Sequence, residues 1–112
     1  MDEKEEILIE NVNEYYSSGL DAFNNKKYNV GTTLFFKCIA ALLDLSIYRK
    51  EGIIPSSHTN RFRILEERYL RLYKIADRDF PFYQDSYTNK MDKEAADLLK
   101  EDAEKLKKEL KI

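Results

Sequence analysis

The stretch that decides the fold runs from Thr33 to Tyr48 and reads TLFFKCIAALLDLSIY. Only Lys37 and Asp44 carry charge in it, and because they are seven residues apart they share one face of an α-helix. A helix that is apolar around most of its circumference has to be covered on most sides. We therefore predict that a helix over residues 28–49 is the central helix of a bundle, or that it also supplies a subunit interface.

An amphipathic pattern precedes this helix and predicts another over residues 3–24. The polar segment 24–27, NNKK, is a break of hairpin length between the two. The apolar stripe of the first helix steps by three or four residues and consists of Leu8, Val12, Tyr15, Tyr16, Leu20 and Phe23.

Residues 50–57 are predicted to form a loop, because Gly52 permits a turn and Pro55 disfavours helix at the residue before it. Apolar residues at helical spacing then predict a third helix that ends near Ala76. The candidate N-cap residues of this helix are Ser56, Ser57 and Thr59.

The C-terminal third of the chain is also predicted to be helical. Pro81 either begins a short helix or interrupts one, because it has no backbone N–H to donate. The last helix is expected to begin near Asp92, a good N-cap residue, and to run close to the C-terminus. Since no segment alternates as a β-strand does, we predict a single all-α domain over residues 1–112, a bundle of four to five helices.

The composition limits the functions that the chain can have. Its 112 residues suffice for one core, and 19 basic residues against 21 acidic ones leave a formal net charge of −2. A bulk basic surface for nucleic acid is therefore excluded, and any RNA contact has to come from a local patch. The acidic start MDEKEEILIE does not resemble a secretion signal, and the longest apolar run, Cys38 to Leu43, is too short for a bilayer. We expect a cytoplasmic protein with no membrane contact.

Several kinds of catalytic or metal site are set aside by the residue types present. The three glycines never cluster into a phosphate loop, and a single histidine and a single cysteine exclude two-histidine metal motifs and thiolate zinc sites. Cys38 lies in an apolar run and is expected to be a small buried side chain. The acidic residues near the N-terminus suit the first turn of a helix. We expect no cofactor and no metal.

His58 opens the third predicted helix, three residues before Arg61. In one interpretation the imidazole and the guanidinium converge on a phosphate at a helix N-terminus, where free N–H groups favour anions. In the other, His58 takes part in capping or packs against the loop. A single histidine does not decide between the two.

An aromatic cluster with interleaved cations begins in the second half of the third predicted helix and continues beyond it; it consists of Tyr69, Tyr73, Phe80, Phe82, Tyr83 and Tyr87. Its rings could stack on bases, and Arg71, Lys74 and Arg78 could hold phosphates. We predict that Tyr69 and Phe80 are buried in the core. Tyr83 and Tyr87 are expected to border a groove, with the ring inside and the hydroxyl at the edge.

The order of these features resembles the HEPN superfamily of small helical proteins. The resemblance rests on the segments EYYSSGLDAFNNKKYNVGTTLFFKCIAALLDL, GIIPSSHTNRFRIL, YLRLY and RDFPFYQDSYTNKMDKEAADLLKEDAEKL, within residues 11–107. It implies an up-and-down antiparallel bundle, usually a homodimer with a groove at the dimer interface. Many such proteins are metal-independent ribonucleases, often toxins paired with a nucleotidyltransferase antitoxin, with the motif R-x4–6-H.

The chain departs from that motif, because Arg78 is followed five residues later by Tyr83 rather than by histidine. A tyrosine, with a pKa of about 10, is a poor base near neutral pH. We therefore expect little or no nuclease activity unless His58 substitutes in space. The candidate ligand-binding residues are Arg78, Tyr83, Tyr87, His58 and Arg61.

Three functional hypotheses follow from these residues and from the resemblance. In the first, a HEPN-like protein with little or no catalysis binds RNA or a nucleotide at a dimer groove, in a toxin–antitoxin or nucleotidyltransferase-associated system. In the second, the chain is purely a protein-interaction module, as a homodimer or as the helical partner of a nucleotidyltransferase. In the third, it is a metal-independent ribonuclease.

Overall fold

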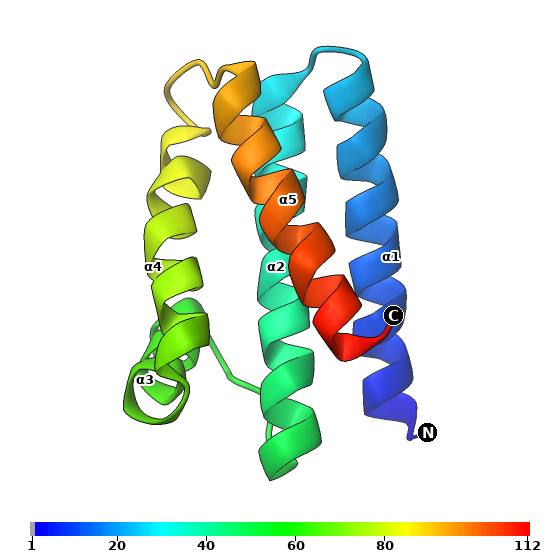
Figure 1. Cartoon of the computed structure of the whole chain (residues 1–112), viewed down its shortest axis with the longest axis vertical. Coiled ribbons are helices and arrows are strands. Elements are labelled where there is room, and N and C mark those ends of the chain that lie inside the picture. Colours follow the sequence, from blue (N-terminus) through cyan, green and yellow to red (C-terminus); the bar gives the residue numbers. More distant parts are fainter. Residues whose placement is uncertain (1) are drawn as a thin grey trace.

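The computed structural model describes residues 2–112, which fold into five α-helices and, within that range, no β-strand (Figure 1). The helices are α1 (Glu3–Asn24), α2 (Tyr28–Glu51), α3 (His58–Arg68), α4 (Leu70–Asp85) and α5 (Lys93–Leu110). Helices α1, α2, α4 and α5 run alternately up and down, and the short α3 lies at the end of the bundle where α2 ends and α4 begins (Figure 1). The prediction of an all-α bundle is confirmed.

Helix α2 occupies the centre of this bundle and packs against α1, α4 and α5. Every residue from Phe35 to Ile47 is buried except Lys37. The apolar circumference that the sequence shows is therefore covered by helices of the same chain. This confirms that α2 is the central helix, and its burial requires no second subunit.

Helix α2 also has the length and composition of a candidate membrane span. Within residues 2–112 it is the one helix that is long and apolar enough to cross a bilayer. The expectation that no segment has the length for this, which rested on the short run Cys38 to Leu43, is therefore wrong by that criterion. Buried core helices meet the same criterion, and 78% of its most apolar window is buried in this fold. The radius of gyration of 13.4 Å agrees with about 13 Å for a compact domain of this size. The fold is thus that of a globular domain with an apolar central helix.

The helix ends follow the capping chemistry of the sequence. The side chains of Asp2, Ser57 and Asp92 each accept a hydrogen bond from a first-turn N–H, at 2.8, 3.0 and 2.8 Å. Ser57 is thus the cap among the three candidates for α3, and Asp92 caps α5 as predicted. Gly52 ends α2 with a left-handed φ of 72°, which glycine adopts without strain. The helix itself extends to Glu51, two residues beyond its predicted end.

The third predicted helix is in fact two helices. The backbone breaks at Tyr69, with φ −138° and ψ 65°, and α4 starts at the next residue. The apolar periodicity continues through this break, and the sequence therefore does not reveal it. Pro81 lies inside α4 rather than at its start or end, and it is exposed. The helix continues past Pro81, whose missing N–H leaves the carbonyl of Asp77 without its helical partner.

Asn29, at the start of α2, fixes the connection between α4 and α5. Its side-chain amide donates to the carbonyls of Ser86 and Asn89, at 2.9 and 2.7 Å, and its oxygen accepts from the N–H of Met91 at 2.9 Å. These bonds satisfy backbone groups that no helix would satisfy. They hold the end of α4, and with it Tyr87, in a defined place.

Candidate functional site

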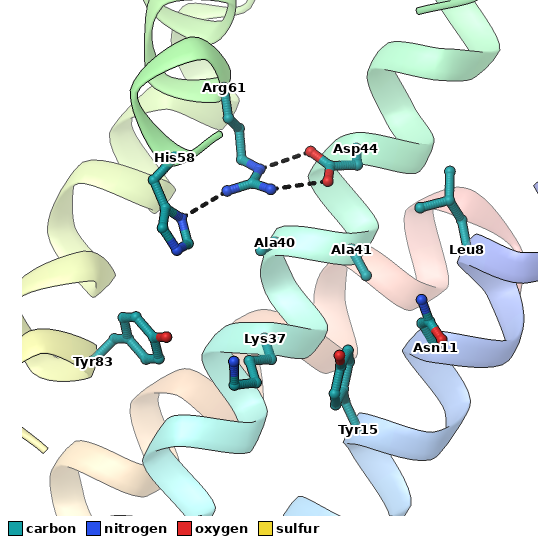
Figure 2. A pocket seen from close by; sticks show the side chains of 10 residues that line it. All are labelled: Leu8, Asn11, Tyr15, Lys37, Ala40, Ala41, Asp44, His58, Arg61 and Tyr83. Carbon is teal, nitrogen blue, oxygen red and sulfur yellow. Dashed lines mark hydrogen bonds and ion pairs between the residues drawn. The ribbon is translucent and has the colours of Figure 1, made fainter. Parts of the chain in front are cut away.

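A pocket of about 220 Å³ opens across the middle of α2, between α1 on one side and α3 and α4 on the other (Figure 2). Its lining consists of Leu8, Asn11 and Tyr15 from α1, Lys37, Ala40, Ala41 and Asp44 from α2, His58 and Arg61 from α3, and Tyr83 from α4. Four segments that are distant in sequence therefore meet at one concave site.

The floor of the pocket is the charged face of α2. Lys37 and Asp44 are two helical turns apart, and Ala40 and Ala41 lie between them. The two methyl groups are short, so the walls stand above them and leave a hollow. The same sequence feature that sets this face apart from the core, two charges seven residues apart, thus also creates the site.

The upper end of the pocket in Figure 2 is closed by an ion pair between α2 and α3. Arg61 Nε donates to Asp44 Oδ1 at 2.7 Å, and a terminal nitrogen of the same guanidinium donates to Oδ2 at 2.9 Å. Each of the two side chains is only 11% exposed. The remaining terminal nitrogen of Arg61 donates to His58 Nδ1 at 2.8 Å.

His58 is held neutral by this arrangement. An arginine only donates, so Nδ1 must be the acceptor, and the proton of the neutral ring lies on Nε2. Burial, followed by the cations of Arg61 and Lys37, lowers the pKa of His58 below its usual 6.5. The ring packs beside Phe80 and Tyr83, with centroids 5.3 and 5.9 Å away. Because Arg61 occupies the free lone pair, His58 offers a hydrogen-bond donor but no base.

Tyr83 forms the wall opposite α1. Its ring stacks on Phe36 with centroids 4.8 Å apart, and only 8% of the residue is exposed. The Tyr83 hydroxyl and that of Tyr87 are 2.8 Å apart, whereas Tyr87 itself is 68% exposed. The ammonium of Lys37 lies 5.8 Å from the centre of the Tyr83 ring, within cation–π range.

The pocket carries one uncompensated positive charge. Asp44 and Arg61 neutralise each other, His58 is neutral, and no carboxylate within residues 2–112 forms an ion pair with Lys37. The positive charge of Lys37 therefore remains available to a ligand. A cation beside aromatic walls and free hydrogen-bond donors suits an anionic, partly aromatic molecule.

Arg78, the arginine of the motif-like segment, has other partners. It donates to Asp79 at 3.1 Å and to Asp102 of α5 at 2.5 Å, and it does not line the pocket. Burial, followed by the Asp102 carboxylate, raises the pKa of Asp79 to about 8. The Arg78 side chain is 52% exposed and lies apart from this pocket, so its part in ligand binding stays a prediction.

The structure thus brings together four of the five candidate residues. His58, Arg61 and Tyr83 line one pocket, and Tyr87 reaches it through the Tyr83 hydroxyl, whereas Arg78 contacts α5. Lys37 and Asp44 were expected to share one helical face, but neither was predicted to be a site residue. Their isolation within an apolar helix was the available signal, since a charge there needs a partner or a cavity.

The burial predicted for the aromatic cluster is wrong in detail. Tyr83 is buried in the core, whereas Tyr69 and Phe80 are only half-buried. Helical spacing alone had placed Tyr69 and Phe80 on inward-facing positions, whereas Tyr83 was expected to border a groove, and it does line the pocket. The stacking of Tyr83 on Phe36 decides the outcome, because it draws that ring inward while its hydroxyl stays at the pocket.

Other titratable residues offer no metal site in the described part of the chain. No group of three or more His, Cys, Asp or Glu side chains within residues 2–112 is arranged to hold a metal ion. Glu3, Glu5 and Glu6 form the acidic first turn of α1, as expected. Cys38 is fully buried, and burial raises the pKa of its thiol to about 12, which leaves it unreactive.

Comparisons with protein-family models, with curated proteins and with solved structures find no match for this chain. The function is therefore inferred from the geometry of the pocket and from the resemblance seen in the sequence.

Proposed function

We propose that this chain is a HEPN-like helical protein that binds RNA or a nucleotide and has little or no catalytic activity. The observation that carries the proposal is the uncompensated ammonium of Lys37 beside the buried ring of Tyr83. In the cell the protein would act in the cytoplasm, in a toxin–antitoxin or nucleotidyltransferase-associated system. The net charge of −2 restricts binding to this local site.

The lack of catalysis follows from the hydrogen bonds of His58. General acid–base catalysis needs a group with a free lone pair or a transferable proton near neutral pH, and it commonly contributes about 10² to 10⁴ in rate. His58 gives its lone pair to Arg61, and the phenol of Tyr83 is too weak a base. The alternative of a metal-independent ribonuclease needs His58 beside Arg78, whereas His58 bonds to Arg61 and Arg78 bonds to Asp102.

Fluorescence anisotropy with labelled single-stranded RNA tests the proposal at low salt. We expect binding by the wild type, at least tenfold weaker binding by Lys37→Met, and unchanged binding by Arg78→Ala. Lys105→Met is the matched control, because Lys105 is an exposed residue of α5 and its loss changes the net charge equally. Equal weakening by both lysine variants, or no binding by the wild type to RNA or to any mononucleotide, would refute the proposal.

A second candidate function is that of a protein-interaction module, as a homodimer or as the partner of a nucleotidyltransferase. The exposed apolar residues Ile53 and Ile54, in the α2–α3 loop, and Leu70, at the start of α4, favour it. Sedimentation of the purified chain distinguishes a dimer from a monomer. A strict monomer that also fails to co-purify with a nucleotidyltransferase from its native source would exclude this function.

A further inference from the structure

The size of the pocket limits what it can hold. Sites for drug-sized ligands usually measure about 300 to 1,000 Å³, whereas this pocket measures about 220 Å³. A continuous segment of RNA would not fit inside it. One planar group above Ala40 and Ala41, with a charged group beside it, matches the volume better.

The α1 wall supplies two polar side chains to the pocket. Asn11 and Tyr15 lie one helical turn apart and face the pocket (Figure 2). Among residues 2–112 neither the Asn11 amide nor the Tyr15 hydroxyl forms a hydrogen bond, although both residues are half-buried. An asparagine amide offers a donor and an acceptor side by side, the pattern that pairs with the N6 and N7 edge of adenine.

The charged group of a ligand would lie beside Lys37 in the same pocket. Lys37 lies between the α1 wall and Tyr83, and its ammonium has no carboxylate partner within the described residues (Figure 2). The Nε2–H of His58 is a second donor, since Nδ1 is engaged by Arg61. A phosphate at Lys37 would therefore find a full positive charge, and it would meet no unpaired carboxylate because Asp44 is held by Arg61.

From these contacts we infer that the pocket binds one nucleotide, with an adenine base above Ala40 and Ala41 read by Asn11 and its phosphate on Lys37. This inference rests on the proposed function, because it names the ligand class of the same site. It predicts that the chain recognises a free mononucleotide or a single nucleotide at an RNA end, and not an internal segment.

Isothermal titration of the full chain with AMP, GMP, adenosine and inorganic phosphate tests the inference. We expect AMP to bind at least tenfold more tightly than GMP, and adenosine to bind at least tenfold more weakly than AMP. Lys37→Met should bring AMP down to the affinity of adenosine and leave adenosine itself unchanged. Asn11→Leu, which keeps the size of the side chain, should abolish the preference for AMP over GMP.

The outcomes separate this inference from the proposed function. Binding of RNA that depends on Lys37, without binding of any mononucleotide, would overturn the inference and leave the proposed function in place. Equal binding of AMP and GMP, unaffected by Asn11→Leu, would show that the site holds a phosphate only and would also overturn the inference. Failure of both RNA and mononucleotides to bind would overturn both proposals.

Discussion

The guanidinium of Arg61 holds both carboxylate oxygens of Asp44, at 2.7 and 2.9 Å, and so fastens the first turn of α3 to the middle of α2. Both side chains are almost fully buried. A buried ion pair contributes little net stability over an apolar pair, but the loss of one partner leaves a charge without compensation. Removal of one partner should therefore destabilise the protein more than removal of both.

Arg61→Leu is expected to lower the free energy of unfolding by about 3 kcal/mol, because it leaves the Asp44 carboxylate buried and unpaired. The double variant Asp44→Leu/Arg61→Leu should recover most of that loss. Urea denaturation of the wild type, the single variants and the double variant gives the coupling energy.

The matched control for that cycle is the pair of Arg71 and Glu109, which is also joined by two hydrogen bonds, at 3.0 and 2.9 Å. Its side chains are 66% and 45% exposed. Exposed pairs contribute about 0 to 1 kcal/mol, so Arg71→Leu should cost far less than Arg61→Leu. Equal losses at the two positions would contradict the role assigned to burial.

Asp79 is expected to make the protein less stable as pH rises. Its pKa is raised from 3.8 to about 8 in the folded state, so the folded chain binds more protons than the unfolded chain between these values. The stabilising contribution is complete below pH 3.8 and is lost as pH rises to about 8. Urea denaturation at several pH values should show this decline, and Asp79→Asn should remove most of it.

Asp77→Asn is the control, because Asp77 lies two residues away on the exposed face of α4. We expect it to leave the decline in stability with rising pH as it is in the wild type. A decline that survives Asp79→Asn would show that other groups cause it and would contradict the raised pKa of Asp79.

His58 should have the opposite effect on stability. Because its pKa is lowered below 6.5 in the folded state, the unfolded chain gains a proton first as pH falls. The contribution of neutral His58 is therefore present above pH 6.5 and is lost as pH falls through that value toward the lowered folded pKa. Measured in the Asp79→Asn background, His58→Asn should flatten this loss. If stability falls equally steeply with pH in that acidic range with and without His58, the conclusion that its ring is neutral and bonded to Arg61 is contradicted.

Two glycines of the α1–α2 contact should respond in opposite directions to alanine. A Cβ at Gly19 would lie 2.9 Å from the ring of Phe35, which is fully buried and cannot move aside cheaply. Gly19→Ala should therefore destabilise the protein by about 1 to 3 kcal/mol. A Cβ at Gly31 meets its nearest atom at 3.7 Å, an ordinary contact.

Gly31→Ala should accordingly stabilise the protein by about 0.5 to 1 kcal/mol, the usual gain in a helix interior. Thermal denaturation of the two variants, followed by circular dichroism, gives both values. A stabilising Gly19→Ala would mean that α1 and α2 can separate locally without cost.

The sequence was sufficient for the fold because local patterns and burial agree along most of the chain. The apolar circumference of residues 33–48 predicted that α2 lies at the centre, and the N-cap residue Asp92 predicted the start of α5. The break at Tyr69 was not predictable, since the apolar stripe runs through it without interruption. Only the packing of α3 against α4 reveals that the chain changes direction there.

The site was predicted in part, and for a similar reason. His58 and Arg61 are one helical turn apart, so their contact followed from spacing. The partner of Arg61 did not, because Asp44 lies 17 residues earlier in another helix. Arg78 was singled out by its place in a motif, but Asp102, 24 residues later, occupies its guanidinium. Long-range partners of this kind depend on how the helices dock.

Helix α2 supplies both the centre of the core and the floor of the pocket, on different faces of the same 24 residues. The floor is therefore as rigid as the core, and mutations that alter it also risk unfolding the domain. Two wall residues are freer of that constraint, since Asn11 on α1 is half-buried, His58 on α3 is exposed, and neither belongs to the apolar core. Substitutions that change ligand specificity, in natural relatives or in engineered variants, should therefore concentrate on those wall positions.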